Sequence, residues 1–349
     1  MKFGFNTSVT RRTLIAAGLA AAVSGGGAMA ADQTLIDAAK KEGEVVWYSS
    51  LIVNQLVRPF AEAFEAKYGI KVHYSRTPAG EMALKLVNEI KADSLQADVF
   101  DGNSAFFQAM PLDNLVAYSP PPAADYPAEL KDAGGRYHAI NVAVLTTSVN
   151  TSLVPEAEWP KTYDDLLDPK WQGKMAWTTD LTPNGPPGFI GNILKVYGED
   201  KGMDYLGKLA AQDIVKVPAS QRVVLDQVIA GEHMLGLMTF DHHAVISAAK
   251  GAPVAWLRIE PLVSTGNYVG LLKNSPHPNA GKLFIDYILS MEGQEVFQKA
   301  NYLPAHPNVP AANVELKPEG GHFKATVITN EEALAGLPKW TRIYKDLFE

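Results

Sequence analysis

Hydrophobic positions between residues 40 and 110 alternate between short compact runs and longer amphipathic stretches. The compact runs at residues 44–48, 70–74 and 97–100 have the form of buried strands. Between them, apolar residues recur at spacings of three and four through residues 56–68 and 80–90, which predicts two amphipathic helices. This alternation favours an α/β fold with doubly wound, mostly parallel sheets.

Two later extended segments predict a second lobe and a hinge. Residues 139–149 form a long β-branched run, and residues 253–259 and 266–271 form an extended stretch that returns the chain to the first lobe. We expect both segments to cross between the lobes and to act as hinge strands. The expected first lobe comprises residues 31–140 and 265–310, the second lobe residues 141–264, and a C-terminal tail packed on the lobes residues 311–349.

The first 30 residues have the form of a cleavable signal peptide. Arg11 and Arg12 precede a mildly apolar run at residues 14–23, and the small-residue triplet 28–30 predicts cleavage after Ala30. The apolar run is too short to span a membrane, which requires about 20 residues. The arginine pair favours twin-arginine export, and an ordinary secretory signal is the alternative. Either route predicts a periplasmic protein.

Composition and charge exclude several classes of protein. The chain has no cysteine, which excludes disulfides, thiolate zinc sites, iron–sulfur clusters and a cysteine nucleophile. The formal net charge of -7 argues against a partner with a phosphate backbone. We therefore expect a globular protein that binds no nucleic acid and holds no cofactor.

Candidate ligand groups lie where the predicted strands end, because helix N-termini there offer free backbone amides. Four loops meet this condition, at residues 49–50, 77–81, 102–104 and 178–188. The fourth loop is rich in glycine, proline and hydroxyl groups and precedes a predicted helix at residues 189–197. It has two interpretations, an anion cradle or an ordinary surface loop.

Charged residues near these loops suggest two kinds of chemistry. Arg76 can pair with a carboxylate or phosphonate, although an arginine at a strand end is also an ordinary surface residue. Asp241, His242 and His243 can ligate a transition metal or donate hydrogen bonds to an anion. Adjacent side chains diverge on a strand or helix, so we do not expect His242 and His243 to chelate one ion together. The predicted ligand-binding residues are Ser49, Ser50, Arg76, Thr77, Gly80, Asn103, Ser104, Thr178, Thr179, Asp241 and His242.

The sequence resembles periplasmic solute-binding proteins of ABC importers, within the group related to ferric-iron and phosphonate-binding proteins. The segments that carry the resemblance are residues 42–50, 64–72, 97–100, 163–174, 277–290 and 292–294, in the family's order. The resemblance implies a type II periplasmic binding protein fold, with two α/β lobes that close around one solute. It also implies a monomer that delivers its solute to an inner-membrane permease and its ATPase without chemistry.

One departure from the family bears on the solute. Ferric-binding members hold iron with an adjacent tyrosine pair in the second lobe, whereas the comparable residues 237–243 contain no tyrosine. We therefore expect a small anion, such as a carboxylate or phosphonate. The alternative is iron or another metal held by Glu81, Asp241 and His242, although Glu81 also reads as a helix N-terminal acid.

Two other classes carry less weight. An exported hydrolase is a remote alternative, because the chain contains no Gly-x-Ser-x-Gly, His-Glu-x-x-His or phosphate-loop motif. A sensor that presents a ligand to a membrane receptor is the other, since one fold serves several functions. We expect a binding protein rather than an enzyme.

Overall fold

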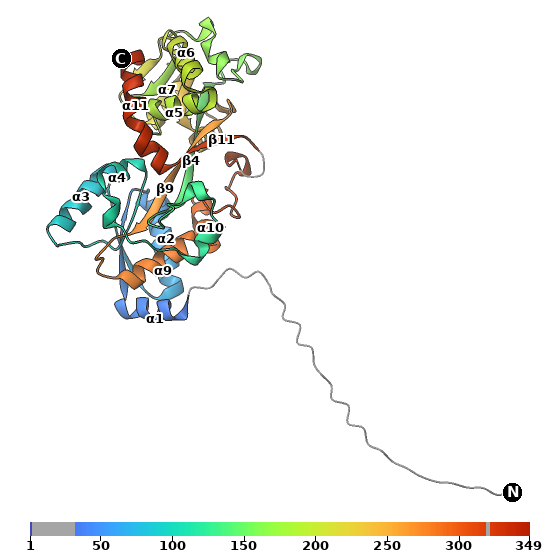
Figure 1. Cartoon of the computed structure of the whole chain (residues 1–349). Helices are drawn as coiled ribbons and strands as arrows, with labels where there is room; N and C mark the ends of the chain where they lie inside the picture. The colour runs from blue at the N-terminus through green and yellow to red at the C-terminus, as the bar shows by residue number, and fades with distance from the viewer. Residues whose placement is uncertain (2–31, 319–321) are drawn as a thin grey trace.

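The computed structural model describes Met1 and residues 32–318 and 322–349, so the rest of the expected signal peptide lies outside the described residues. One continuous mixed sheet runs through two α/β lobes (Figure 1). Its strands lie in the order β2 (Lys71–Arg76), β1 (Glu44–Ser49), β3 (Val99–Gly102), β9 (Leu262–Leu271), β4 (His138–Asn150), β7 (Leu235–Phe240), β5 (Met175–Thr178) and β6 (Val215–Val217). β8 (Val254–Leu257) and β10 (Leu303–Pro304) pair with β4, and β11 (Ala325–Ile328) pairs with β9. Among the described residues, no helix combines the length and the apolar character that a membrane crossing requires.

The first lobe is built on the parallel strands β1, β2 and β3. Trp47 of β1 is fully buried and packs against the rings of Phe60 and Phe284 at centroid distances of 5.7 and 5.1 Å. The elements are α1 (Gln33–Glu42), β1 (Glu44–Ser49), α2 (Arg58–Tyr68), β2 (Lys71–Arg76), α3 (Ala79–Lys91), β3 (Val99–Gly102), α4 (Ser104–Ala109), α9 (Pro278–Leu289), α10 (Met291–Lys299) and β10 (Leu303–Pro304).

The second lobe has its own hydrophobic core, centred on Trp177 and closed by the C-terminal helix. Tyr344 and Phe348 of that helix pack on Trp177 at centroid distances of 5.8 and 4.8 Å. The elements are β5 (Met175–Thr178), α5 (Pro186–Tyr197), α6 (Glu199–Ala210), β6 (Val215–Val217), α7 (Gln221–Ala230), β7 (Leu235–Phe240), α8 (Asp241–Ala248), β8 (Val254–Leu257), β11 (Ala325–Ile328) and α11 (Asn330–Phe348).

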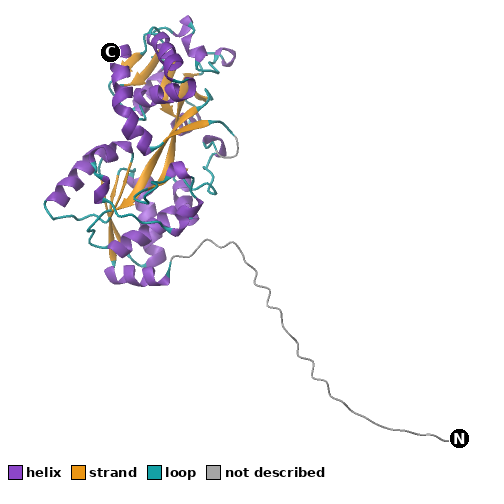
Figure 2. Ribbon diagram, viewed as in Figure 1, coloured by secondary structure: helices purple, strands orange, loops and turns teal. Residues whose placement is uncertain are grey.

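Two long antiparallel strands, β4 (His138–Asn150) and β9 (Leu262–Leu271), run through the narrow region between the lobes (Figure 2). Their pairing extends from His138 opposite Val269 to Leu145 opposite Val263. The register shifts at Ile140, whose carbonyl accepts a hydrogen bond from Gln294 at 2.9 Å. Short 3-10 helices lie at Leu112–Asn114, Pro121–Asp125, Ala128–Leu130, Glu156–Glu158, Asp164–Leu167, Pro169–Trp171 and Val314–Leu316, and a π-helical turn at Val53–Val57.

One element differs from the sequence expectation. α5 begins at Pro186 rather than Phe189, because proline is favoured in the first turn of a helix, where its missing amide hydrogen costs no bond. The C-terminal segment forms a strand and one 19-residue helix. A capping box between Thr329 and Glu332 starts this helix.

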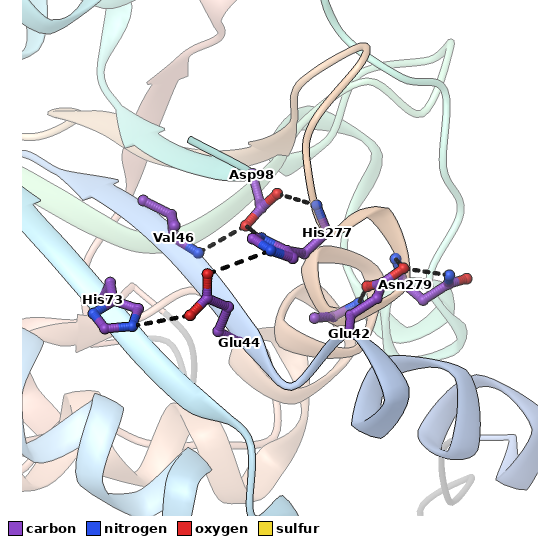
Figure 3. Close-up of polar contacts among 8 residues, drawn as sticks. Glu42, Glu44, Val46, His73, Asp98, His277 and Asn279 are labelled. Atoms are coloured by element: carbon purple, nitrogen blue, oxygen red, sulfur yellow. Dashed lines mark hydrogen bonds and ion pairs between the residues drawn. The ribbon is translucent and has the colours of Figure 1, made fainter. Parts of the chain in front are cut away.

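A polar cluster lies at the amino end of β1, where α9 begins (Figure 3). The carboxylate of Glu42 accepts hydrogen bonds from the amides of Asn279 and Ala280, at 3.2 and 2.7 Å, and so caps α9 from the neighbouring helix α1. Asp98 and His277 form the buried part of the cluster. Because this cluster is at the opposite end of β1 from its carboxyl terminus, it joins helices to the sheet and does not belong to the candidate site.

Candidate functional site

The carboxyl ends of the parallel strands in both lobes lie beside the middle of the crossing strands. β3 ends at Gly102, which is paired with Tyr268 of β9. β7 ends at Phe240, which is paired with Leu145 of β4, and Leu145 is paired with Val263 of β9. The rise along β9 between these two points is about 17 Å at roughly 3.3 Å per residue. The loops that follow the strands of the two lobes therefore face one another across the hinge.

The two serines of the first loop differ in accessibility. Ser49 is fully buried, and its hydroxyl accepts a hydrogen bond from the amide of Leu51 at 3.1 Å. Ser50 is half-buried, and its amide and hydroxyl donate to Oδ1 of Asp101 at 3.0 and 2.7 Å. Burial raises the pKa of Asp101, against hydrogen bonds from Ser49, Ser50 and Asn267 that lower it. Asp101 thus anchors the loop, and Ser50 is the more accessible of the two serines.

The second loop presents charged side chains to solvent. Arg76 ends β2 beside Ser49, is exposed, and forms no ion pair within residues 32–318 and 322–349. The amide of Thr77 donates to the carbonyl of Ser49 at 3.0 Å and fixes the turn. Glu81 is exposed in the first turn of α3. Gly80 lies in the same turn, where an added Cβ would be 3.9 Å from a carbonyl oxygen of α4, so α3 and α4 begin close together.

The third loop leads directly into α4. Oδ1 of Asn103 accepts a hydrogen bond from the amide of Ala105 at 3.0 Å, so Asn103 caps the helix. Ser104, the first helical residue, is half-buried. Both residues lie where β3 ends beside β9, but the oxygen of the Asn103 side chain is occupied by its capping bond.

The threonines of the fourth loop are held by the β6–α7 connection. Thr178 is 1% exposed, and its hydroxyl donates to the carbonyl of Ala219 at 2.5 Å and accepts from the amide of Asp180 at 3.0 Å. The amide of Thr179 donates to the carbonyl of Val217 at 3.0 Å. The Thr178 side chain therefore supports the loop, whereas the half-buried side chain of Thr179 is more accessible.

Asn184 joins this loop to the hinge. Its Oδ1 accepts a hydrogen bond from the hydroxyl of Thr265 on β9 at 2.7 Å. Its backbone carbonyl accepts from Nε2 of Gln221 at 3.1 Å, and Nε2 also lies 3.4 Å from the Asp180 carboxylate. The loop is tight: an added Cβ at Gly188 would lie 1.7 Å from the carbonyl oxygen of Pro183. The position of α5 relative to the hinge is thus determined by specific contacts.

Asp241 and the two histidines lie at the start of α8. Asp241 is fully buried and its Oδ1 accepts a hydrogen bond from the His242 amide at 2.6 Å, whereas Oδ2 has no partner among the described residues. Burial raises the pKa of Asp241 well above its ordinary value. Burial lowers the pKa of His242 to about 4 and that of His243 to about 3, the latter also through the charges of His242 and Arg222. Both imidazoles are therefore neutral at pH 7.

A small cavity of about 50 Å³ lies between α8 and residues of the first lobe. His242, Val245 and Ile246 line it on one side, and Tyr302, Leu303 and Leu316 line it on the other. The hydroxyl of Tyr302 accepts a hydrogen bond from the amide of Ile52 at 3.4 Å. Burial raises the pKa of Tyr302, and the charges of Asp101 and Arg76 act on it in opposite directions. Tyr302 therefore lies between the first two loops and α8.

The residues suggested for a metal do not form a metal site. Within residues 32–318 and 322–349, no group of three or more histidine, aspartate or glutamate side chains is arranged to hold a metal ion. Glu81, Asp241 and His242 are accordingly not gathered around one point. The buried Asp241 and the two neutral histidines are instead the first three residues of α8.

Several residues at this junction escaped the sequence analysis. They are Asp101, Asn184, Gln221, Thr265, Asn267 and Tyr302. Thr265 and Asn267 carried a usable signal, because polar residues two positions apart in a long buried strand point to one face. Tyr302 carried none, because its place depends on the packing of α10 against the first lobe.

Three of the helix N-termini at this junction share one property. α3, α5 and α7 begin here without a side-chain hydrogen bond to their first amides. At the same junction Asn103 caps α4, and the Asp241 carboxylate accepts from the His242 amide in the first turn of α8. α1, α10 and α11 are also capped, by Asp32, Ser290 and Thr329. A helix N-terminus carries about half a positive charge together with free amide donors. These helix dipoles contribute positive potential to the junction.

Curated proteins with similar sequences come from several bacteria. A putative 2-aminoethylphosphonate-binding periplasmic protein of Salmonella paratyphi A is 23% identical over 287 residues, covering 80% of this chain and 80% of that protein. An Fe(3+)-binding periplasmic protein of Serratia marcescens is 25% identical over 288 residues, covering 79% of this chain and 82% of that protein.

Solved structures share the fold. The periplasmic binding protein AfuA of Actinobacillus pleuropneumoniae, with fructose-6-phosphate bound, superposes with a TM-score of 0.68 at 24% identity, covering 88% of this chain and 98% of that one. The Trichodesmium protein IdiA (FutA), in complex with iron and citrate, has a TM-score of 0.74 at 20% identity, covering 87% and 99%. The expected type II periplasmic binding protein fold is confirmed.

The sequence profile of one family matches most of the chain. It covers residues 60–325, which include the second, third and fourth strand-end loops, both crossing strands and the start of α8. The matched residues therefore include most of the junction between the lobes. The chain belongs to the family of bacterial extracellular solute-binding proteins.

Proposed function

We propose that the protein captures a small anionic solute between its two lobes and delivers it to an ABC importer. The observation that carries the proposal is that the N-termini of α3, α5 and α7 at the junction of the lobes are uncapped. α3 and α7 supply amide donors there, whereas α5 begins with Pro186 and Pro187 and contributes its dipole. An anion fits this arrangement because it satisfies donors that no side chain of the protein occupies.

The side chains add one cation to these backbone donors. Arg76 is exposed at the edge of the junction, where it can pair with a phosphonate, phosphate or carboxylate through two hydrogen bonds. Ser50, Thr77, Gly80, Asn103, Ser104 and Thr179 are the proposed neutral contacts from the surrounding loops, with Ser49 and Thr178 supporting them. The relatives whose names give 2-aminoethylphosphonate and fructose-6-phosphate support this solute class, because both compounds carry anionic groups. The names of other relatives give iron, alone or with citrate.

Metal transport is the less favoured reading of the same site. Residues 237–243 contain no tyrosine, and Glu81, Asp241 and His242 do not form a metal-binding group. In this proposal His242 contributes to the wall of the solute site, and the buried Asp241 supports the start of α8 through its hydrogen bond with the His242 amide. A neutral His242 can donate one hydrogen bond to an anion without a change of protonation.

The proposal extends to location and partners. The family is extracellular, and we infer export by the twin-arginine route with cleavage after Ala30. The mature chain then works as a periplasmic monomer with an inner-membrane permease and its ATPase, without catalysis, nucleic acid or a resident cofactor. Export is tested by N-terminal sequencing of protein recovered from the periplasm, where a first residue other than Ala31 contradicts the cleavage site.

Thermal-shift screening and calorimetry test the solute class. The panel contains phosphate, 2-aminoethylphosphonate, fructose 6-phosphate, citrate and ferric chloride. We expect one of the organic anions to stabilise the protein, because a ligand at 100 times its Kd adds about 2.7 kcal/mol. Stabilisation by ferric chloride alone, or by none of the panel, contradicts the proposal.

A matched pair of variants tests the role of Arg76. Arg76→Ala should weaken binding of the stabilising anion about tenfold or more, because a charged hydrogen bond is lost. Arg258→Ala is the control, because Arg258 pairs with Glu315 and follows β8, an antiparallel strand, rather than one of the parallel strands whose ends form the junction. If the two variants bind with equal affinity, Arg76 does not contact the solute.

A further inference from the structure

Thr265 and Asn267 occupy the same face of the crossing strand β9. They are two positions apart, and side chains at such positions point to one side of a strand, about 6.6 Å apart. Both are almost fully buried, with exposures of 7% and 9%. Buried polar side chains of this kind are normally satisfied by hydrogen bonds, and each of these two bonds to a different lobe.

Asn267 is bonded to the first lobe. Its Nδ2 donates to Oδ1 of Asp101 at 3.2 Å. The same oxygen accepts both hydrogen bonds from Ser50, so one carboxylate atom joins the hinge strand to the first ligand loop. Because Asp101 is fully buried, water cannot replace a bond that is broken there.

Thr265 is bonded to the second lobe. Its hydroxyl donates to Oδ1 of Asn184 at 2.7 Å. Asn184 directly precedes Gly185, the N-cap of α5, and its carbonyl is held by Gln221 of α7. Thr265 is therefore linked through Asn184 to the N-termini of α5 and α7, which face the junction.

We propose that Thr265 and Asn267 are positioning residues that couple the two ligand loops through β9. The hydrogen-bonded path runs from Ser50 through Asp101 and Asn267, along one strand to Thr265, and on to Asn184. If either loop moves relative to β9, a buried acceptor loses its hydrogen-bond donor. The two loops accordingly keep a fixed relation to the hinge strand and respond to each other's displacement, whichever solute binds.

Amide hydrogen exchange of the solute-free protein tests this coupling. The reporters are the amide of Ser50, which donates to Asp101, and the amide of Asn184, which lies 3.3 Å from the Thr182 hydroxyl. Thr265→Val should raise the exchange rate of Ser50 in the opposite lobe, and Asn267→Leu should raise that of Asn184. We expect each crossed effect to be about three- to tenfold, the scale of one lost hydrogen bond.

Two further variants separate coupling from simple destabilisation. Thr265→Ser keeps the hydroxyl and should leave the Ser50 amide as in the wild type, whereas Thr265→Ala removes the hydroxyl without added bulk and should match Thr265→Val. Thr147→Val alters a buried threonine of the other crossing strand, with 6% exposure, and should affect neither reporter.

The crossed effects decide the outcome. If each substitution at 265 or 267 changes only the reporter in its own lobe, or if Thr147→Val reproduces the crossed effects, the proposed path is wrong. Because the measurement uses no solute, this result is independent of the proposed solute class. If no anion of the panel binds, the proposed hinge coupling still stands. If the crossed effects are absent, the proposed solute class still stands.

Discussion

Nδ1 of His277 lies 3.0 Å from Oδ2 of Asp98, a carboxylate that is fully buried between β1 and α9 (Figure 3). The His277 amide donates to the other carboxylate oxygen at 2.6 Å, and the Val46 amide donates to Oδ2 at 2.8 Å. Burial raises the pKa of Asp98, and these hydrogen bonds oppose the increase. One buried carboxylate thus joins β1 to the start of α9.

Replacement of His277 by alanine should destabilise the first lobe. The variant keeps the backbone hydrogen bond but removes the imidazole, so Oδ2 of Asp98 retains only the Val46 amide. We expect a loss of about 2–3 kcal/mol in the free energy of unfolding. Urea denaturation measures this loss, and hydrogen exchange at Val46 shows whether it is local to β1.

The control for this variant is His73→Ala. His73 lies 3.2 Å from Glu44 in the same cluster, but its side chain is 55% exposed. Exposed ion pairs contribute little to stability, so this variant should unfold close to the wild type. Equal losses in the two alanine variants would show that burial of Asp98 does not determine the energetics of the cluster.

Alanine substitutions at two glycines should show whether the fourth loop belongs to the solute site. An alanine at Gly188 places its Cβ 1.7 Å from the carbonyl oxygen of Pro183, so the loop or the start of α5 must move. We expect Gly188→Ala to reduce both stability and solute affinity. Calorimetric titration and thermal unfolding measure the two effects.

Gly207→Ala is the matched control for this substitution. Gly207 lies in α6 with no atom within 4 Å of an added Cβ. Alanine is favoured over glycine in a helix by about 0.5–1 kcal/mol, so Gly207→Ala should raise stability and leave affinity unchanged. An affinity that survives Gly188→Ala would remove the fourth loop from the site.

The stability of the protein should depend on pH through His138. This residue is 4% exposed on β4, and burial lowers its pKa to about 4, with Lys131 acting in the same direction and Asp132 against it. The ordinary value of 6.5 applies to the unfolded chain. Between these values the unfolded chain holds a proton that the folded chain lacks, so stability falls as pH decreases from about 6.5 toward 4.

The variant His138→Gln should lose less stability on acidification than the wild type. The difference between the two proteins should approach about 3 kcal/mol at the acidic end of this window. Urea denaturation at pH 7.5 and pH 4.5 gives the comparison. Identical losses in the two proteins would assign the acid sensitivity to other groups.

The strands and the two-lobe fold were predictable because apolar runs and turn residues report local structure directly. The runs at residues 44–48 and 139–149 correspond to β1 and β4 within one residue at each end. The site was harder, because burial decides which hydroxyl is free: Ser49 and Ser50 are adjacent, yet only Ser50 is accessible. Partners from distant segments, such as Thr265 and Asn184, have no signature in local spacing.

Closure of the lobes around a bound anion is the central claim, and an interlobe distance tests it most directly. The chain has no cysteine, so Leu84→Cys on α3 and Val223→Cys on α7 introduce unique labelling sites at positions that are 58% and 39% exposed. Double electron–electron resonance then measures the distance between spin labels on the two lobes. With the anion that gives the largest thermal shift, the distance distribution should move to shorter values and become narrower, because binding across both lobes favours the closed state. An unchanged distribution at a saturating concentration of that anion would contradict a solute site between the lobes.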